Sequence, residues 1–181
     1  MATGPTLTPG TRRVFRVVTW LSFVTILVVA TYGVVASYGT KLPVGQTLVD
    51  VYWPISPYFA QPVTYFSVAC IAFFYAGLRI WQERIMRWPP ALLSFLQLFG
   101  FVVAFSSAYE VLYNFMLWGS TYSIACANSI IAHTPCNPDV IISSYPVPWN
   151  LVFATRAFAA LFVISGYSVY YLRRLSGSEL I

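Results

Sequence analysis

Four stretches of the sequence are long and apolar enough to cross a membrane, and they limit the fold more than any other feature. They cover roughly residues 14–38, 62–81, 90–118 and 149–172. The hydrocarbon core of a bilayer is about 30 Å thick, which a helix of about 20 apolar residues can cross. Pro62 and Pro148 stand where the second and fourth stretches begin, and proline is favoured in the first turn of a helix. The sequence therefore predicts four transmembrane helices.

The composition excludes a water-soluble domain. Hydrophobic residues make up 59% of the chain and charged residues 8%, whereas about 25% of the residues of a soluble domain are charged. We therefore predict an all-α integral membrane protein, a four-helix bundle that forms one transmembrane domain over residues 1–181. The first stretch is longer than the core of a signal peptide, about 7–15 residues, so we interpret it as a retained helix.

The basic residues predict how the chain is oriented. Cytoplasmic loops of membrane proteins are rich in Lys and Arg. Eight of the arginines fall on one side of a four-span topology, and the loops of the other side contain only Lys41. These arginines are Arg12, Arg13, Arg16, Arg79, Arg84, Arg87, Arg173 and Arg174. We therefore expect both termini in the cytoplasm, two extracytoplasmic loops, and a multi-pass protein of the cell membrane. Because the positive charge sits at helix ends, it indicates no nucleic-acid partner.

The first outer loop, about residues 39–61, is aromatic and rich in proline. It contains the segment VYWPISPYFAQP, in which the prolines prevent a regular helix. One interpretation is a segment that lies in the membrane interface. The other is a lid over a cavity that opens outward.

The second outer loop, about residues 119–148, contains two cysteines. Cys126 and Cys136 lie outside by the charge rule, where thiols are usually oxidised, so we predict a disulfide. A metal site that uses these cysteines with His133 and Asp139 is an alternative, but the spacing matches no familiar zinc pattern. We expect no metal and no cofactor.

Glu110 lies inside the third predicted span, although a charged residue there costs at least about 2.5–3.5 kcal/mol. Such residues usually face the interior of a bundle and have a partner. Arg156 in the fourth span is the clear candidate, because both residues lie about 10–12 Å inward of a tryptophan at the outer interface. Consecutive spans are usually neighbours, so we predict an ion pair between Glu110 and Arg156.

Further polar residues surround this predicted pair. Ser106, Glu110, Tyr113 and Asn114 recur at helical spacing, and Tyr109 adds a hydroxyl nearby. Two interpretations stay open. The pair and its neighbours fix which helices touch, or they line an outward-facing pocket for a polar headgroup, a small solute or a proton.

The chemistry that the spans lack points away from catalysis. They contain no histidine, the chain has no Cys-x-x-Cys motif, and the acids are scattered. We therefore predict a non-enzymatic protein, a structural or accessory subunit in the lipid bilayer that packs against another membrane protein or a second copy of itself. The alternative is binding or transport of a small solute, lipid headgroup or proton at Glu110, Asn114 and Arg156. An integral membrane enzyme that acts on lipid is the least supported function.

Overall fold

Four long helices make up most of the structure, a computed structural model that describes residues 7–51, 53, 61–136 and 151–177. Each of the four is long and apolar enough to cross a membrane. They are α1 (Pro9–Thr40), α3 (Pro62–Ile80), α5 (Pro90–Ile131) and α7 (Leu151–Gly177). Two short helices, α2 (Val44–Asp50) and α4 (Gln82–Ile85), lie in the connections. The predicted all-α architecture with four membrane-spanning helices is confirmed, and it indicates a multi-pass membrane protein.

Local sequence explains where the helices begin. Pro9, Pro62 and Pro90 occupy the first turns of α1, α3 and α5, where a missing N–H leaves no hydrogen bond unmade. The hydroxyl of Thr8 also caps α1, because it accepts a hydrogen bond from the backbone N–H of Thr11 at 3.3 Å. The predicted start at Pro62 is confirmed, whereas Pro148 lies outside the described residues.

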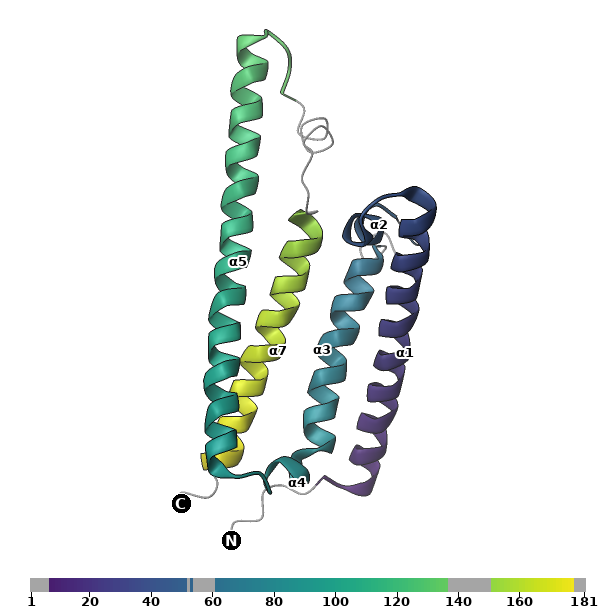
Figure 1. Ribbon diagram of the computed structural model, residues 1–181, viewed down its shortest axis with the longest axis vertical. Helices are drawn as coiled ribbons and strands as arrows, with labels where there is room; N and C mark the ends of the chain where they lie inside the picture. Colours follow the sequence, from purple (N-terminus) through teal and green to yellow (C-terminus); the bar gives the residue numbers. More distant parts are fainter. Residues whose placement is uncertain (1–6, 52, 54–60, 137–150, 178–181) are drawn as a thin grey trace.

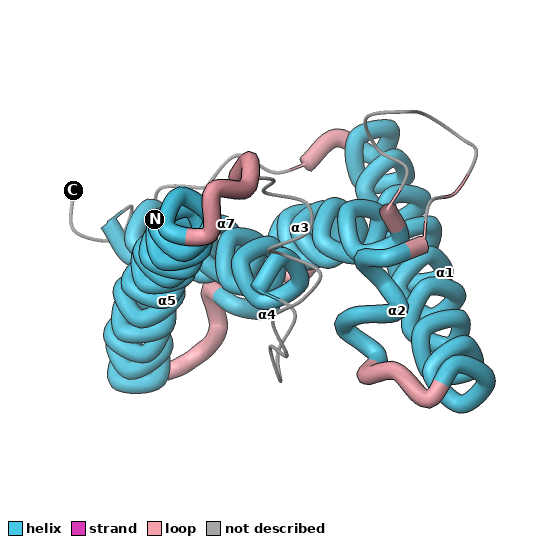
Figure 2. The backbone as a smooth tube through the Cα atoms, turned by 90° about the horizontal axis from the view of Figure 1, so that it is seen from above, coloured by secondary structure: helices cyan, strands magenta, loops and turns pink. Residues whose placement is uncertain are grey.

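The long helices stand side by side in an open row, in the order α1, α3, α7, α5 (Figures 1 and 2). Within the described residues, α1 contacts neither α7 nor α5, and α3 does not contact α5. The predicted pairing of the last two spans is confirmed, because α7 packs along α5. The predicted bundle is not closed by the described helices, however, so one long side of α5 and one of α1 have no neighbour among them.

The arginines that the sequence places on one side lie together at one end of the long helices, measured along the helix axes. At this end α1 begins, α4 connects α3 to α5, and α7 ends (Figure 1). We call it the basic end and the opposite end the far end. That the basic end faces the cytoplasm, and that the two connections at the far end are extracytoplasmic, stay predictions.

The short helix α2 packs between α1 and α3 at the far end of these helices. Leu48 and Val49 of α2 are buried against Val29 of α1 and Val63 of α3. The absence of a side chain at Gly33 allows this approach, because a Cβ there would lie 2.9 Å from the Leu48 side chain. Part of the first predicted outer loop is therefore helical and packed.

The rest of that loop is only partly described. Trp53 packs between two tyrosine rings, with its ring centroid 5.4 Å from that of Tyr32 and 5.6 Å from that of Tyr65. Residues 52 and 54–60 lie outside the described residues, so neither the interfacial segment nor the lid is tested.

The contact between α5 and α7 uses small and polar side chains. Ala104, Ser107 and Asn114 are the buried residues of α5. A Cβ at Gly100 would lie 2.8 Å from the side chain of Val169 on α7, so the two helices touch backbone to side chain there. Small residues allow such close approach of membrane helices.

Helix α5 continues well past the predicted end of the third span. It runs to Ile131 rather than to about Trp118, so the first part of the predicted loop at residues 119–148 is helical. The sequence from Gly119 onward has no proline before residue 135, so no residue forces the helix to end. The predicted disulfide joins Cys126 in α5 to Cys136 after it, with their Cα atoms 5.1 Å apart. The remainder of the predicted loop lies outside the described residues.

Candidate functional site

Arg156 links α7 to the beginning of α3. It lies about 7.5 Å along α7 from the first residue, Leu151. Its Nη1 group donates to the side-chain oxygen of Gln61, the residue just before α3, and to the hydroxyl of Thr64 at 3.0 Å. The guanidinium is therefore held between two neighbouring helices by neutral acceptors at the far end of the row.

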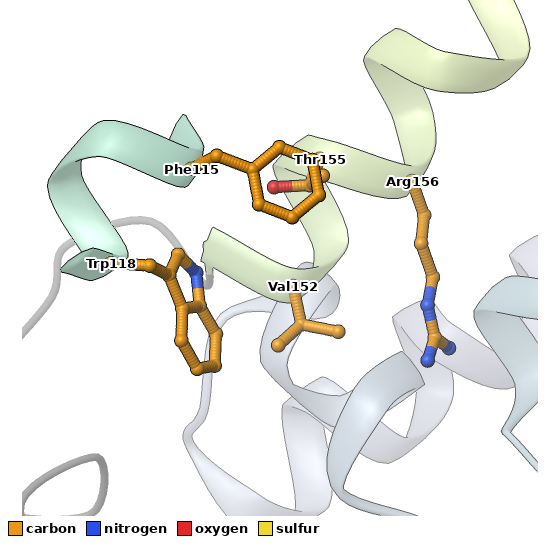
Figure 3. Close-up of a pocket in the computed structure, with 5 residues that line it drawn as sticks. All are labelled: Phe115, Trp118, Val152, Thr155 and Arg156. Carbon is orange, nitrogen blue, oxygen red and sulfur yellow. The ribbon is translucent and has the colours of Figure 1, made fainter. Parts of the chain in front are cut away.

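Glu110 and Arg156 do not form the predicted ion pair. Among the described residues the single ion pair joins Arg12 to Glu83 at 3.4 Å, and both of those side chains are exposed to a large degree. The reason is the order of the row, because α7 stands between α3 and α5 and its residues divide between these neighbours. Figure 3 shows the side chain of Arg156 running away from α5.

Asn114 is the most buried member of the predicted polar site. Its side chain is 5% exposed, and its Nδ2 group has no hydrogen-bond partner among the described residues. The guanidinium of Arg156 donates to Gln61 and Thr64, and no hydrogen bond joins it to Asn114 among the described residues. Glu110, one turn earlier, is half-buried and has no ion-pair partner within the described chain.

The other predicted members of the site face outward from α5. Tyr109 and Tyr113 are exposed and stack on each other, with ring centroids 6.3 Å apart. Ser106 is exposed as well. The helical spacing of these residues is real, but their stripe lies on the flank of α5 rather than against α7. The six predicted residues are thus not brought together into one pocket.

A cavity of about 250 Å³ does lie between the far-end portions of α5 and α7 (Figure 3). Phe115 and Trp118 of α5 and Val152, Thr155 and Arg156 of α7 line it. The hydroxyl of Thr155 donates to the carbonyl of Leu151 in its own helix at 2.7 Å. The cavity walls therefore suit an apolar group, and Glu110 is not among them.

A second cluster of interacting side chains, which the sequence did not reveal, lies at the basic end. The Nε–H of Arg79 on α3 donates to the Tyr167 hydroxyl of α7 at 3.1 Å. The guanidinium carbon also lies 5.0 Å from the ring centroid of Tyr171 and 5.6 Å from that of Tyr75. Cations are attracted to aromatic faces at such distances. Arg79 and these tyrosines thus join α3 to α7.

The same cluster includes α4. The Tyr171 hydroxyl donates to the side-chain oxygen of Gln82 at 2.8 Å, and both residues are buried. Nearby, Ile85 of α4 packs with Leu172 and Leu175 of α7. The sequence contains one indication of this cluster: Tyr75 precedes Arg79 by four residues, so both side chains lie on the same face of the helix.

The described residues offer no metal site of the kind considered from the sequence. No group of three or more His, Cys, Asp and Glu side chains gathers within residues 7–51, 53, 61–136 and 151–177. Cys126 and Cys136 are joined to each other, and Asp139 lies outside the described residues. The sulfur atoms of Cys126 and Cys136 are therefore bonded to each other and are not thiolate ligands.

No protein-family model, curated protein or solved structure matches this chain.

Proposed function

We propose that the protein is an accessory subunit of a membrane-protein assembly in the cell membrane, and that α5 is the helix that docks on the partner. The proposed partner is a different membrane protein that has an extracytoplasmic part. No catalytic step is assigned to the chain.

The position and length of α5 support this role. It stands at one edge of the row, and α7 is its neighbour among the described helices. Its 42 residues extend about 63 Å, whereas the hydrocarbon core of a bilayer is about 30 Å thick. The side away from α7 carries exposed apolar residues throughout, among them Leu98, Phe101, Phe105, Leu112 and Met116.

The observation that carries the proposal is the apolar surface beyond the predicted membrane boundary at Trp118. Ile124, Ile130 and Ile131 are 53%, 71% and 77% exposed. They lie up to about 20 Å past Trp118 along α5, where lipid no longer covers a helix perpendicular to the bilayer. Burying an isoleucine side chain contributes about 1.5–3 kcal/mol, so a protein partner that covers these residues gains substantial binding energy.

Site-specific photo-crosslinking in native membranes tests the proposal. A benzophenone amino acid at Ile124 should give a crosslink to one other membrane protein. The matched control is the same probe at Tyr122, which is also exposed but points about 160° away around the helix. Equal crosslinking from both positions would contradict a specific docking face. A product that contains two copies of this chain would replace the partner by a homo-oligomer.

The alternative function, binding or transport of a polar solute, has less support. It requires Glu110, Asn114 and Arg156 to act together, but Arg156 bonds to residues of α3 instead. The cavity beside Arg156 is lined mainly by apolar groups. We therefore retain the accessory role as the proposal.

A further inference from the structure

A large apolar groove lies between α1, α3 and α7. Its volume is about 480 Å³. The residues that line it are hydrocarbon or aromatic, chiefly Val18 of α1, Val68, Ile71 and Tyr75 of α3, and Ile164 and Tyr167 of α7. All of these belong to helices that are apolar enough to cross a membrane, so the groove lies at membrane depth.

The guanidinium of Arg79 lies at the basic end of this groove. Tyr75 and Tyr167 line the groove and also contact Arg79, so the apolar walls lead directly to the guanidinium. The distance from Val68 to Arg79 along α3 is about 16 Å. The groove and Arg79 together therefore form an elongated site, apolar along its length and positively charged at one end.

The guanidinium of Arg79 has unused hydrogen-bond donors. A guanidinium carries five N–H groups. Arg79 uses its Nε–H on Tyr167, and its two Nη groups make no hydrogen bond within the described chain. The tyrosine rings of residues 75 and 171 hold it by their faces, which orients the guanidinium without neutralising its charge. Arginine with two free Nη groups is well suited to bind phosphate in bidentate geometry.

The surrounding charge also favours an anion. Arg12, Arg84 and Arg174 lie at the same end, on α1, α4 and α7. Among the described residues of this end the single carboxylate is Glu83, which pairs with Arg12 at 3.4 Å. No described acidic residue is therefore left to neutralise Arg79.

We propose that this groove binds an anionic phospholipid, with an acyl chain along the apolar walls and the phosphate on the Nη groups of Arg79. A free phosphate would have no use for the apolar walls, and an uncharged apolar partner would leave the guanidinium without an anion. A lipid satisfies both parts of the site at once. Basic sites between transmembrane helices on the cytoplasmic side are suited to anionic headgroups, and the charge rule predicts that this is the cytoplasmic side.

Native mass spectrometry of the full-length protein tests the proposal. Phosphatidylglycerol and phosphatidylcholine of identical acyl chains would be titrated into the detergent-purified protein. We expect Arg79→Gln to weaken phosphatidylglycerol binding about tenfold or more, because charge-assisted hydrogen bonds are lost. Arg84→Gln removes the same charge from an exposed side chain at the same end that does not line the groove, and it should weaken binding much less than Arg79→Gln does.

A second variant separates the site from general effects on folding. Ala72 also lines the groove, so Ala72→Trp fills it without changing the charge and should weaken phosphatidylglycerol binding as well. Circular dichroism and an intact Cys126–Cys136 disulfide confirm that each variant folds. Equal losses for Arg79→Gln and Arg84→Gln, or unchanged binding in Ala72→Trp, would overturn the proposal. Displacement of the lipid by millimolar inorganic phosphate would assign the site to free phosphate instead.

Discussion

Arg156 is a cation inside an apolar helix that, among the described residues, is held by neutral acceptors and not by a carboxylate. Its hydrogen-bond acceptors are the side chains of Gln61 and Thr64, at the beginning of the neighbouring helix. Hydrogen bonds to a charged group contribute about 1.5–3 kcal/mol, more than bonds between neutral groups. Arg156 therefore fixes the far end of α7 against α3.

Replacing Thr64 tests this role. Thr64→Val keeps the shape of the side chain and removes the acceptor at 3.0 Å, so we expect a loss of about 1.5–3 kcal/mol in the free energy of unfolding. Reversible unfolding in mixed micelles measures it. The control is Thr25→Val in α1, whose hydroxyl donates to the carbonyl of Leu21 in its own helix. An equal loss of unfolding free energy in Thr25→Val would show that the effect does not come from the hydrogen bond to Arg156.

The partner of a single charged residue was the least predictable feature of the site. The sequence predicts a similar membrane depth for Arg156 and Glu110, but depth does not say toward which neighbouring helix a side chain turns. Gln61 lies at the end of a connection rather than in a span, so hydropathy gives no reason to pair it with a charge inside a span. The sequence marks Arg79 only as one of the charges that orient the chain, because two of its three tyrosine contacts, Tyr167 and Tyr171, come from α7, far away in sequence.

At the scale of elements, the contact between α5 and α7 depends on the absence of side chains. Gly100 faces Val169 at a distance that leaves no room for a Cβ. Ala104 and Ser107 continue the same buried face. Membrane helices associate through such close packing because lipid provides no hydrophobic force between them.

Two glycines of α5 provide a matched test of this contact. Gly100→Leu places a side chain into Val169 and should destabilise the protein by about 1–3 kcal/mol through overpacking. Gly119→Leu introduces the same residue into the same helix, where nothing lies within 4 Å, and should be neutral or stabilising. Thermal unfolding in detergent distinguishes them. Similar melting temperatures for the two variants would mean that α7 does not pack at Gly100.

At the scale of the whole molecule, apolar length predicted the helices but not their arrangement. Most of the predicted span limits lie within a few residues of the helix ends: α1 runs from Pro9 to Thr40, α3 ends at Ile80, and α7 ends at Gly177. The large difference is α5, which continues past the predicted span end at Trp118 to Ile131. The open row could not be predicted, since hydropathy marks which residues avoid water and not whether lipid or another helix covers them.

The arginines at the basic end predict how the whole row is oriented, and cysteine labelling in intact cells measures it. Arg84→Cys at the basic end should react with a membrane-impermeant maleimide only after permeabilisation, and Thr40→Cys at the far end should react without it. Both side chains are exposed. The unchanged protein is the control, because Cys126 and Cys136 are joined and Cys70 is half-buried in α3. Labelling in the reverse order would place the disulfide in the reducing compartment, where such bonds rarely persist, and would put the Arg79 groove in the outer leaflet.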